Sequence, residues 1–217
     1  MIFGQGMTEH NEYFREPLPS LGRMMVFIDG ENLVLRYEAM VKEDAKPLTL
    51  IDYEPKTFVW RANSIKPELN TILRANYYTY VTGDDNKVNE IKTKIKNLNF
   101  HNYSTQYHNI SVKQLPNNLT PVVFKKTKGK KAKGVDIQMS VDILTHVFRN
   151  NIDIVYLVSG DGDYLPVLQE AVRMGKQVYV AAFSSGLNES LVTIADKFRL
   201  LDPIYFKLPK QENNGNE

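Results

Sequence analysis

Three continuous apolar runs constrain the fold of this chain more than any other feature. They span residues 24–28, 154–158 and 177–183, and every position in them except Gln177 is apolar. Runs without alternating polar residues are typical of strands buried on both faces, as in a parallel sheet covered by helices. The sequence therefore predicts an α/β fold built around a buried, mostly parallel sheet.

Segments with helical spacing alternate with these strands. Further strands are predicted at 76–81 and 122–124, whereas residues 57–60 fit either a strand or an insertion. Alternating strands and amphipathic helices indicate a parallel sheet with helices on both faces. Five segments carry apolar residues three or four positions apart: Leu33, Tyr37 and Met40 or Val41; Val88, Ile91, Ile95 and Leu98; Ile137, Val141, Leu144 and Phe148; Leu165, Leu168 and Val172; and Leu187, Leu191, Ile194 or Ala195, and Phe198.

The domain organisation follows from length and composition. The 217 residues suit one domain. Residues 1–22 are polar and irregular and are expected to form an N-terminal extension. The domain itself is expected over 23–208, with an insertion or elaboration within 42–125, and residues 209–217 are expected to form a flexible tail. We find no internal repeat.

The composition excludes several classes of site. The chain has no cysteine, which excludes disulfides, thiolate nucleophiles and the common structural zinc sites. No apolar stretch approaches the roughly 20 residues that cross a bilayer, and the N-terminus lacks the pattern of a secretory signal. We therefore expect a soluble, cytoplasmic protein with no membrane partner.

Positive charge is concentrated in one segment. The formal net charge is only +2, but six lysines fall within residues 125–133, directly before Asp136. An isolated run of this kind is usually a solvated loop, but cations beside an acidic centre suit a polyanionic substrate. We predict that this segment contacts substrate phosphates through Lys128, Lys130, Lys131 and Lys133.

Aspartates follow two of the predicted buried strands. Asp29 comes directly after residues 24–28, and Asp161 and Asp163 follow residues 154–158. Open parallel sheets bind ligands beyond the carboxyl ends of their strands, where the strand order reverses. If these two strands are neighbours, the three carboxylates meet in one crevice. Asp136, at the start of the helix that follows a Lys-Gly turn, is the fourth candidate.

Four carboxylates in one crevice repel one another unless a cation lies among them. Mg²⁺ and Mn²⁺ prefer oxygen ligands, and such ions commonly act on phosphates by activating water and stabilising the leaving oxygen. We therefore predict Asp29, Asp136, Asp161 and Asp163 as catalytic and metal-binding residues.

Structural interpretations compete with this one. A single Asp after a strand is often only a helix cap, which applies to Asp29 and Asp163 in particular. Asn32 and Ser159 are predicted to contact substrate, although each also fits a polar position in a turn. Asp142 lies six residues after Asp136, so at 100° per residue the two point about 120° apart on one helix. A structural role for Asp142 is therefore favoured over metal ligation.

Three motifs resemble the NYN domain family of PIN-like nucleases in order and spacing. They are F-I-D-G-E-N-L at 27–33, K-G-V-D-I-Q-M-S-V-D at 133–142 and V-S-G-D-G-D-Y-L-P at 158–166, and the segment 184–202 resembles the closing helix and strand of that family. The resemblance covers 24–34 and 130–202 and is poor across 42–125. It implies a Rossmann-like three-layer sandwich with a sheet of about five strands, and a Mg²⁺ or Mn²⁺ site used to cut RNA.

These observations lead to one function and two rivals. We predict a metal-dependent endoribonuclease that cleaves single-stranded RNA by in-line attack of water, with RNA as its partner, and we also consider a homodimer. The first rival is a non-catalytic RNA- or protein-binding regulatory module. The second is another phosphate chemistry, an aspartyl-nucleophile phosphotransferase or a topoisomerase-primase-type site, for which the residue two positions after Asp29 is Glu31 rather than Asp.

Overall fold

The structure is a computed structural model that describes residues 22–66, 68, 70–100, 118–126 and 134–207. The predicted C-terminal tail and nearly all of the predicted N-terminal extension lie outside these residues. So do four of the predicted substrate contacts, Lys128, Lys130, Lys131 and Lys133.

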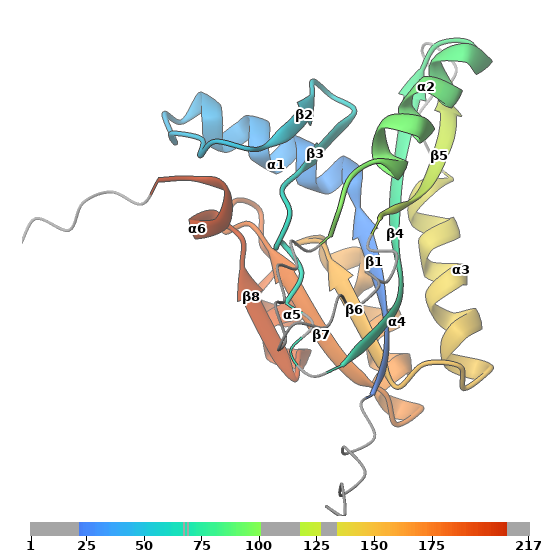
Figure 1. Cartoon of the computed structure of the whole chain (residues 1–217). Coiled ribbons are helices and arrows are strands. Elements are labelled where there is room, and N and C mark those ends of the chain that lie inside the picture. The colour runs from blue at the N-terminus through green and yellow to red at the C-terminus, as the bar shows by residue number, and fades with distance from the viewer. Residues whose placement is uncertain (1–21, 67, 69, 101–117, 127–133, 208–217) are drawn as a thin grey trace, which may run out of the picture.

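The central sheet has six strands in the order β5-β4-β1-β6-β7-β8, and every neighbouring pair is parallel (Figure 1). The predicted α/β class and parallel sheet are confirmed, with one strand more than the five or so expected. The chain runs outward from β1 through β4 to β5 and then returns to β6 on the other side of β1, so the strand order reverses between β1 and β6. The strands are β1 (Arg23–Asp29), β4 (Thr71–Thr82), β5 (Thr120–Lys126), β6 (Ile154–Val158), β7 (Gln177–Ala182) and β8 (Lys197–Leu200).

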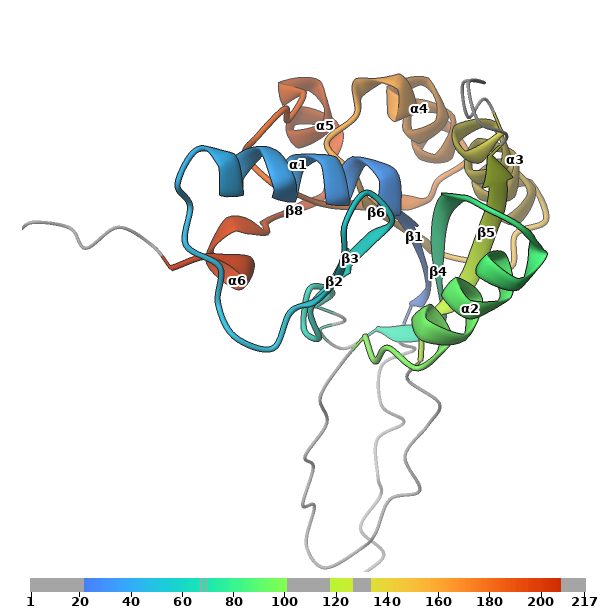
Figure 2. The same ribbon diagram turned by 90° about the horizontal axis from the view of Figure 1, so that it is seen from above.

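Helices cover both faces of the sheet, which makes the predicted three-layer sandwich. One face packs against α3 (Val135–Phe148), α4 (Leu165–Arg173) and α5 (Glu189–Ile194). The other packs against α1 (Gly30–Lys42), α2 (Asp85–Lys96) and α6 (Asp202–Tyr205). Figure 2, seen from above, separates α3, α4 and α5 from α2 and the hairpin on the opposite side of the sheet.

The ambiguous segment 57–60 is a strand. Phe58–Trp60 (β3) pairs antiparallel with Asp52–Glu54 (β2), and this hairpin closes the core on the α1 side. The Tyr77 hydroxyl in β4 accepts a hydrogen bond from the Val59 N–H and donates one to the Val59 carbonyl, at 3.2 and 3.1 Å. The hairpin is therefore tied to the central sheet as well as packed on it.

Two expectations about the C-terminal half need correction. The last predicted helix was expected to include Phe198, but α5 ends at Ile194 and Phe198 lies in β8. The reason is Asp196, whose carboxylate accepts from the Val178 N–H at 2.7 Å while its own N–H donates to the Val178 carbonyl at 2.8 Å. These bonds turn the chain onto β7, where it continues as an edge strand.

The second difference concerns α3. The helix is present, but three of the residues that marked it, Ile137, Val141 and Phe148, are exposed to solvent. A second set of apolar residues packs on the sheet instead: Val135, Met139, Ile143 and Val147.

Among the residues that the structure describes, no helix is both long and apolar enough to cross a membrane.

Candidate active site

The predicted acidic residues surround the carboxyl ends of β1 and β6. These two strands are parallel neighbours, with Ile28 opposite Val158, so the chain leaves both strands at the same edge. This is also the point where the strand order reverses, which is where open α/β sheets form their ligand crevice. The expectation that these two strands are neighbours is confirmed.

Asp29 is buried at the end of β1, with only 3% of its surface exposed. Its Oδ1 accepts from the Asn32 N–H at 2.9 Å, which caps α1, and its Oδ2 accepts from the Ser159 hydroxyl at 3.0 Å. Asp29 is therefore a helix cap, as the structural interpretation had it. It also faces the loop that follows β6, as the functional interpretation requires.

Asn32 and Ser159 hold that loop in place. The Asn32 Oδ1 accepts from the Gly160 N–H at 3.2 Å, and the Ser159 Oγ accepts from the Asp161 N–H at 3.1 Å. Both side chains are buried. Their observed contacts are with backbone and with Asp29, so they position Asp161, and a direct contact with substrate stays a prediction.

Burial raises the pKa of Asp29 to about 7, well above the usual value for a carboxyl group. The hydrogen bonds from Asn32 and Ser159 act in the opposite direction and lower this pKa, whereas the charges of Asp136 and Asp161 raise it further. Like charges act on each other this way only at short range. Asp29, Asp136 and Asp161 therefore lie near enough for their charges to interact, and we call them the acidic centre.

Tyr164 is part of this centre, although the sequence did not single it out. It is buried at the end of the 3₁₀ helix η1 (Gly162–Tyr164), and its hydroxyl donates to Asp136 Oδ1 at 3.1 Å. Burial, followed by the charges of all three carboxylates, holds the pKa of Tyr164 well above its ordinary value. The hydroxyl therefore keeps its proton and orients Asp136.

Glu31 extends the acidic centre towards β4 and β5. Partial burial raises the pKa of Glu31 most, and the charge of Asp136 raises it too, while a hydrogen bond with Tyr80 and the charge of Lys126 lower it. The Lys126 Nζ lies 4.1 Å from the centre of the Tyr80 ring. Lys126, near the start of the predicted lysine segment, thus brings a cation to the rim.

Asp163 stands apart from the other three predicted ligands. Its N–H donates to Asp161 Oδ1 at 3.0 Å, which caps η1, and its own side chain is exposed. It lies beside the acidic centre on the surface, and its role as a ligand stays a prediction.

Asp142 has a structural role, in agreement with its predicted orientation. Its Oδ2 accepts from the Tyr78 hydroxyl of β4 and its Oδ1 accepts from Gln138, both at 2.8 Å. Burial and the adjacent carboxylate raise the pKa of Tyr78 above its ordinary range. The bond from Tyr78 fastens α3 to the sheet and so helps to fix Asp136 at the start of the same helix, while the bond from Gln138 lies within α3 and orients the Asp142 carboxylate.

The acidic centre fits a metal ion that needs few protein ligands. Within the described part of the chain, no group of three His, Cys, Asp or Glu side chains is close enough to hold an ion jointly, and none of the three carboxylates forms an ion pair with a described Lys or Arg. Mg²⁺ keeps several waters and is often bound by one or two carboxylates together with substrate phosphates. A pair of carboxylates from this centre meets that requirement.

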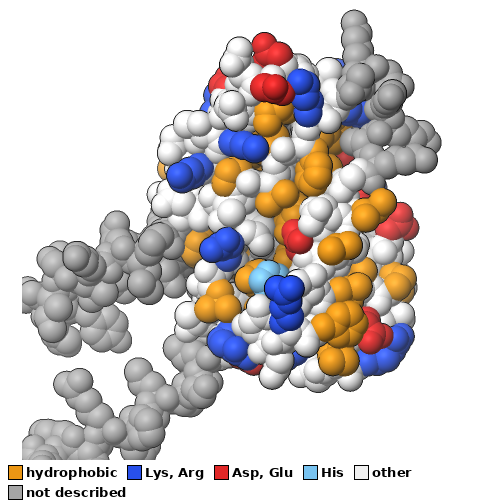
Figure 3. All heavy atoms as spheres, turned by 90° about the vertical axis from the view of Figure 1, so that its right-hand side faces the viewer, with side chains coloured by type: hydrophobic (Ala, Val, Ile, Leu, Met, Phe, Trp, Pro, Cys, Tyr) orange, Lys and Arg blue, Asp and Glu red, His pale blue; other side chains and the backbone are white. Residues whose placement is uncertain are grey.

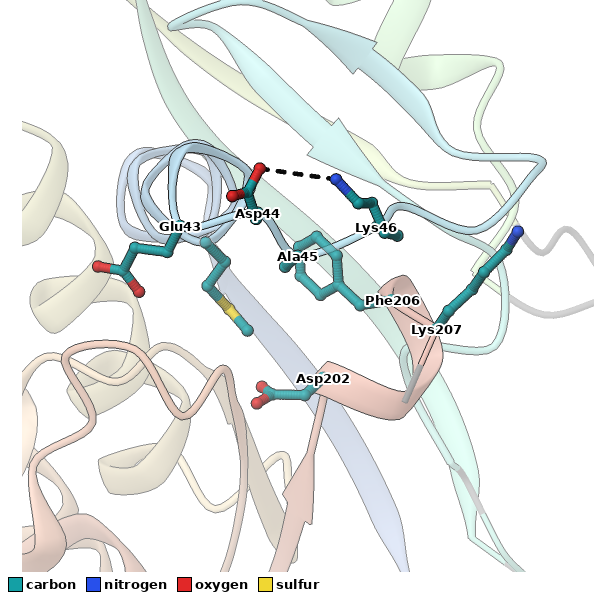
Figure 4. A pocket seen from close by; sticks show the side chains of 8 residues that line it. Glu43, Asp44, Ala45, Lys46, Asp202, Phe206 and Lys207 are labelled. Atoms are coloured by element: carbon teal, nitrogen blue, oxygen red, sulfur yellow. Dashed lines mark ion pairs between the residues drawn. The ribbon is translucent and has the colours of Figure 1, made fainter. Parts of the chain in front are cut away.

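A pocket at the opposite end of α1 is separate from this centre (Figure 4). It has a volume of about 450 Å³ and mixes an apolar floor with both signs of charge. None of the predicted site residues lines it. The lining residues are Met40, Glu43, Asp44, Ala45, Lys46, Asp202, Phe206 and Lys207.

Comparison with known proteins agrees with the motifs and the fold. The family model described as NYN domain matches residues 23–202. The chain belongs to the NYN domain family. This family is grouped with the PIN-like nucleases, which generally use divalent metal ions.

Individual relatives add no established activity. An uncharacterized protein of Methanocaldococcus jannaschii is 40% identical over 62 residues, which is 29% of this chain and 26% of that protein, so the match spans about a quarter of the relative. The crystal structure of a protein of unknown function from Vibrio parahaemolyticus superimposes with a TM-score of 0.56 at 15% identity, covering 88% of this NYN protein and all of that chain. That likeness supports the fold alone.

Proposed function

We propose that this NYN protein is a metal-dependent endoribonuclease that hydrolyses phosphodiester bonds of single-stranded RNA. The observation that carries the proposal is the acidic centre. Three carboxylates from distant parts of the chain lie near the strand switch point, and the pKa of one of them, Asp29, is raised mainly by burial and further by the charges of the other two. Membership of a nuclease family agrees with this chemistry.

The acidic centre would hold Mg²⁺ or Mn²⁺ through a pair of carboxylates from Asp29, Asp136 and Asp161, with Asp163 as the further predicted ligand. Such an ion, when bound, supplies an activated water and stabilises charge on the phosphate and on the leaving oxygen. Hydrolysis by in-line attack of water would leave a 5′-phosphate and a 3′-hydroxyl on the products.

The other residues of the site keep the carboxylates in place. Tyr164 donates to Asp136, and Ser159 donates to Asp29 while accepting from the backbone of Asp161. Asn32 holds the Gly160 backbone. These bonds orient the Asp29 and Asp136 carboxylates and hold the backbone that carries Asp161, which is the kind of preorganisation that electrostatic catalysis requires.

RNA would approach along the ends of β4 and β5. Lys126 lies beside Glu31 at this rim, and the lysines at 128, 130, 131 and 133 follow it in the sequence. Cationic side chains next to an acidic metal site suit a polyanion whose backbone is held on one side while one phosphate reaches the metal.

The direct test is cleavage of a fluorescently labelled single-stranded RNA in Mn²⁺. Asp29→Asn should reduce cleavage to background while the protein stays folded. Asp44→Asn is the matched control, because it makes the same change at an exposed aspartate in the separate pocket, and it should cleave normally. Undiminished cleavage by Asp29→Asn would overturn the proposal.

One observation favours a second candidate, an RNA-binding module without turnover: the described residues include no ready-made group of three metal ligands. This candidate predicts RNA binding without metal-dependent cleavage. In either case, replacing Lys128, Lys130 and Lys131 with Ala should weaken binding and reduce the slope of log affinity against log salt by about 2, at roughly 0.7 per phosphate contact on a single strand. Unchanged salt dependence would mean that these lysines do not contact RNA.

A further inference from the structure

Helix α3 carries two apolar faces, and only one of them is covered. The inner face packs on the sheet. On the other face, Ile137 is 64% exposed, Val141 50% and Phe148 54%, with Leu144 partly buried beside them. At 100° per residue the two faces point about 150° apart. We call Ile137, Val141, Leu144 and Phe148 the outer stripe.

Other hydrophobic side chains are exposed on the same side of the molecule as α3 (Figure 3). Figure 3 looks onto the side of the molecule where α3 lies, and hydrophobic side chains form a band across this face. Contiguous exposed apolar patches on soluble proteins commonly mark contact sites. We therefore expect the outer stripe to be a contact site for a partner.

The spacing of the outer stripe indicates what that partner is. The residues are separated by four, three and four positions, which is the a/d spacing of a helix that packs along another helix. This spacing is the same when read backwards, so the stripe matches a second copy of itself in the antiparallel direction. Ile137 then lies opposite Phe148 of the second copy, and Val141 opposite Leu144. Self-matching of this kind is what a two-fold symmetric interface requires.

The charges around the outer stripe are compatible with this pairing. Gln138, Ser140 and Thr145, which flank it, are uncharged, and Asp142 is held against the sheet by its bond with Tyr78 of β4. No like charges are therefore forced together along the contact, and charged residues are depleted from the centres of protein interfaces. Antiparallel pairing also sets the positive end of each helix dipole beside the negative end of the other.

We propose that this protein forms a two-fold symmetric homodimer in which α3 packs antiparallel against α3 of a second copy through the outer stripe. The proposal does not depend on the proposed nuclease activity. Asp136 points about 110° from the centre of the stripe on the helix, so pairing leaves the acidic centre open in both copies.

The exposed area of the outer stripe determines how stable a dimer we expect. At about 200 Å² for a fully exposed large apolar side chain, the exposed fractions of Ile137, Val141 and Phe148 amount to roughly 340 Å² per chain. The total is then about 700 Å², below the roughly 1,200 Å² at which stable complexes begin. We therefore expect a weak dimer that dissociates on dilution into the low micromolar range.

Sedimentation velocity of the full chain from micromolar to near-millimolar concentration tests the proposal. The wild-type protein should shift from monomer to dimer, and Val141→Glu should stay monomeric throughout. Val172→Glu is the matched control: it makes the same change at a valine of α4 that is 44% exposed, and it should dimerise like the wild type. Circular dichroism checks that both variants are folded. A wild type that stays monomeric, or a Val141→Glu that still dimerises, would overturn the proposal.

Disulfide trapping tests the direction of pairing, because the natural chain has no cysteine. A mixture of Ile137→Cys and Phe148→Cys proteins should form the mixed disulfide on mild oxidation. Either variant alone should not cross-link, because antiparallel pairing separates the two copies of residue 137 by about 16 Å along the helices, beyond the roughly 7 Å that a disulfide spans. Efficient cross-linking of Ile137→Cys alone would contradict the antiparallel arrangement.

Discussion

The raised pKa of Asp29 makes a quantitative prediction about folding that does not depend on activity. In the folded protein this pKa is about 7, whereas in the unfolded chain it is about 3.9. Below both values the group is protonated in both states and has no effect on stability. Between them the unfolded chain loses its proton and the folded protein keeps it, so stability falls by about 1.4 kcal/mol for each pH unit. The full loss, reached above pH 7, is about 4 kcal/mol.

Asp29→Asn removes this loss, since an amide does not ionise. The free energy of unfolding, measured with urea in EDTA, should therefore rise in Asp29→Asn relative to wild type by about 3 kcal/mol between about pH 5 and about pH 8. The amide still caps α1, but it weakens the bond with Ser159, which lowers the variant's stability by about 1 kcal/mol at every pH. The pH dependence of the difference, rather than its value at one pH, is the informative quantity.

The control for this experiment is Asp44→Asn, whose carboxylate is exposed, and its difference from wild type should hardly change with pH. Added Mg²⁺ should restore stability to the wild type above pH 7 and leave Asp29→Asn unaffected, because an ion that binds only the folded state stabilises it. Parallel pH profiles for wild type and Asp29→Asn would refute the argument that burial and neighbouring carboxylates disfavour the charged form of Asp29.

Two further predictions concern the packing that holds the site. Gly30→Ala should destabilise the protein by several kcal/mol in thermal or urea unfolding, because a Cβ there would lie 2.2 Å from the ring of Tyr77. Gly134→Ala, whose nearest contact would be an ordinary 3.7 Å, should change stability by less than about 1 kcal/mol, and an equal loss in both would contradict this reading of the packing. Tyr78→Phe removes the bond to Asp142 and should lower unfolding free energy by about 1–3 kcal/mol, whereas an unchanged value would mean that the bond does not fasten α3.

The sheet could be predicted because its central strands are apolar at nearly every position. The ends of elements were harder to predict. Phe198 continued a helical spacing, and only the contact of Asp196 with β7 decides that the helix stops before it. In α3 the spacing of Ile137 and Val141 identified the helix but not its buried face, because apolar residues occupy both sides. Periodicity alone does not choose between two apolar faces.

Members of the acidic centre could be predicted from the sequence where an aspartate follows the end of a predicted strand. Asp29 and Asp161 follow buried strands, and the parallel pairing of β1 with β6 brings them together. Tyr164 and Glu31 were missed because their roles depend on how a short helical turn directs each side chain, which residue spacing does not resolve. The signal was present: both stand inside the motifs that carry the aspartates.

The central claim is that carboxylates from at least two of Asp29, Asp136 and Asp161 hold a divalent cation. Crystals soaked in Mn²⁺ test it most directly through anomalous scattering. The account predicts a peak within coordination distance of carboxylate oxygens from at least two of these residues, and no such peak in crystals of Asp29→Asn. A wild-type crystal without anomalous density between the ends of β1 and β6, or with its peak elsewhere, would contradict it.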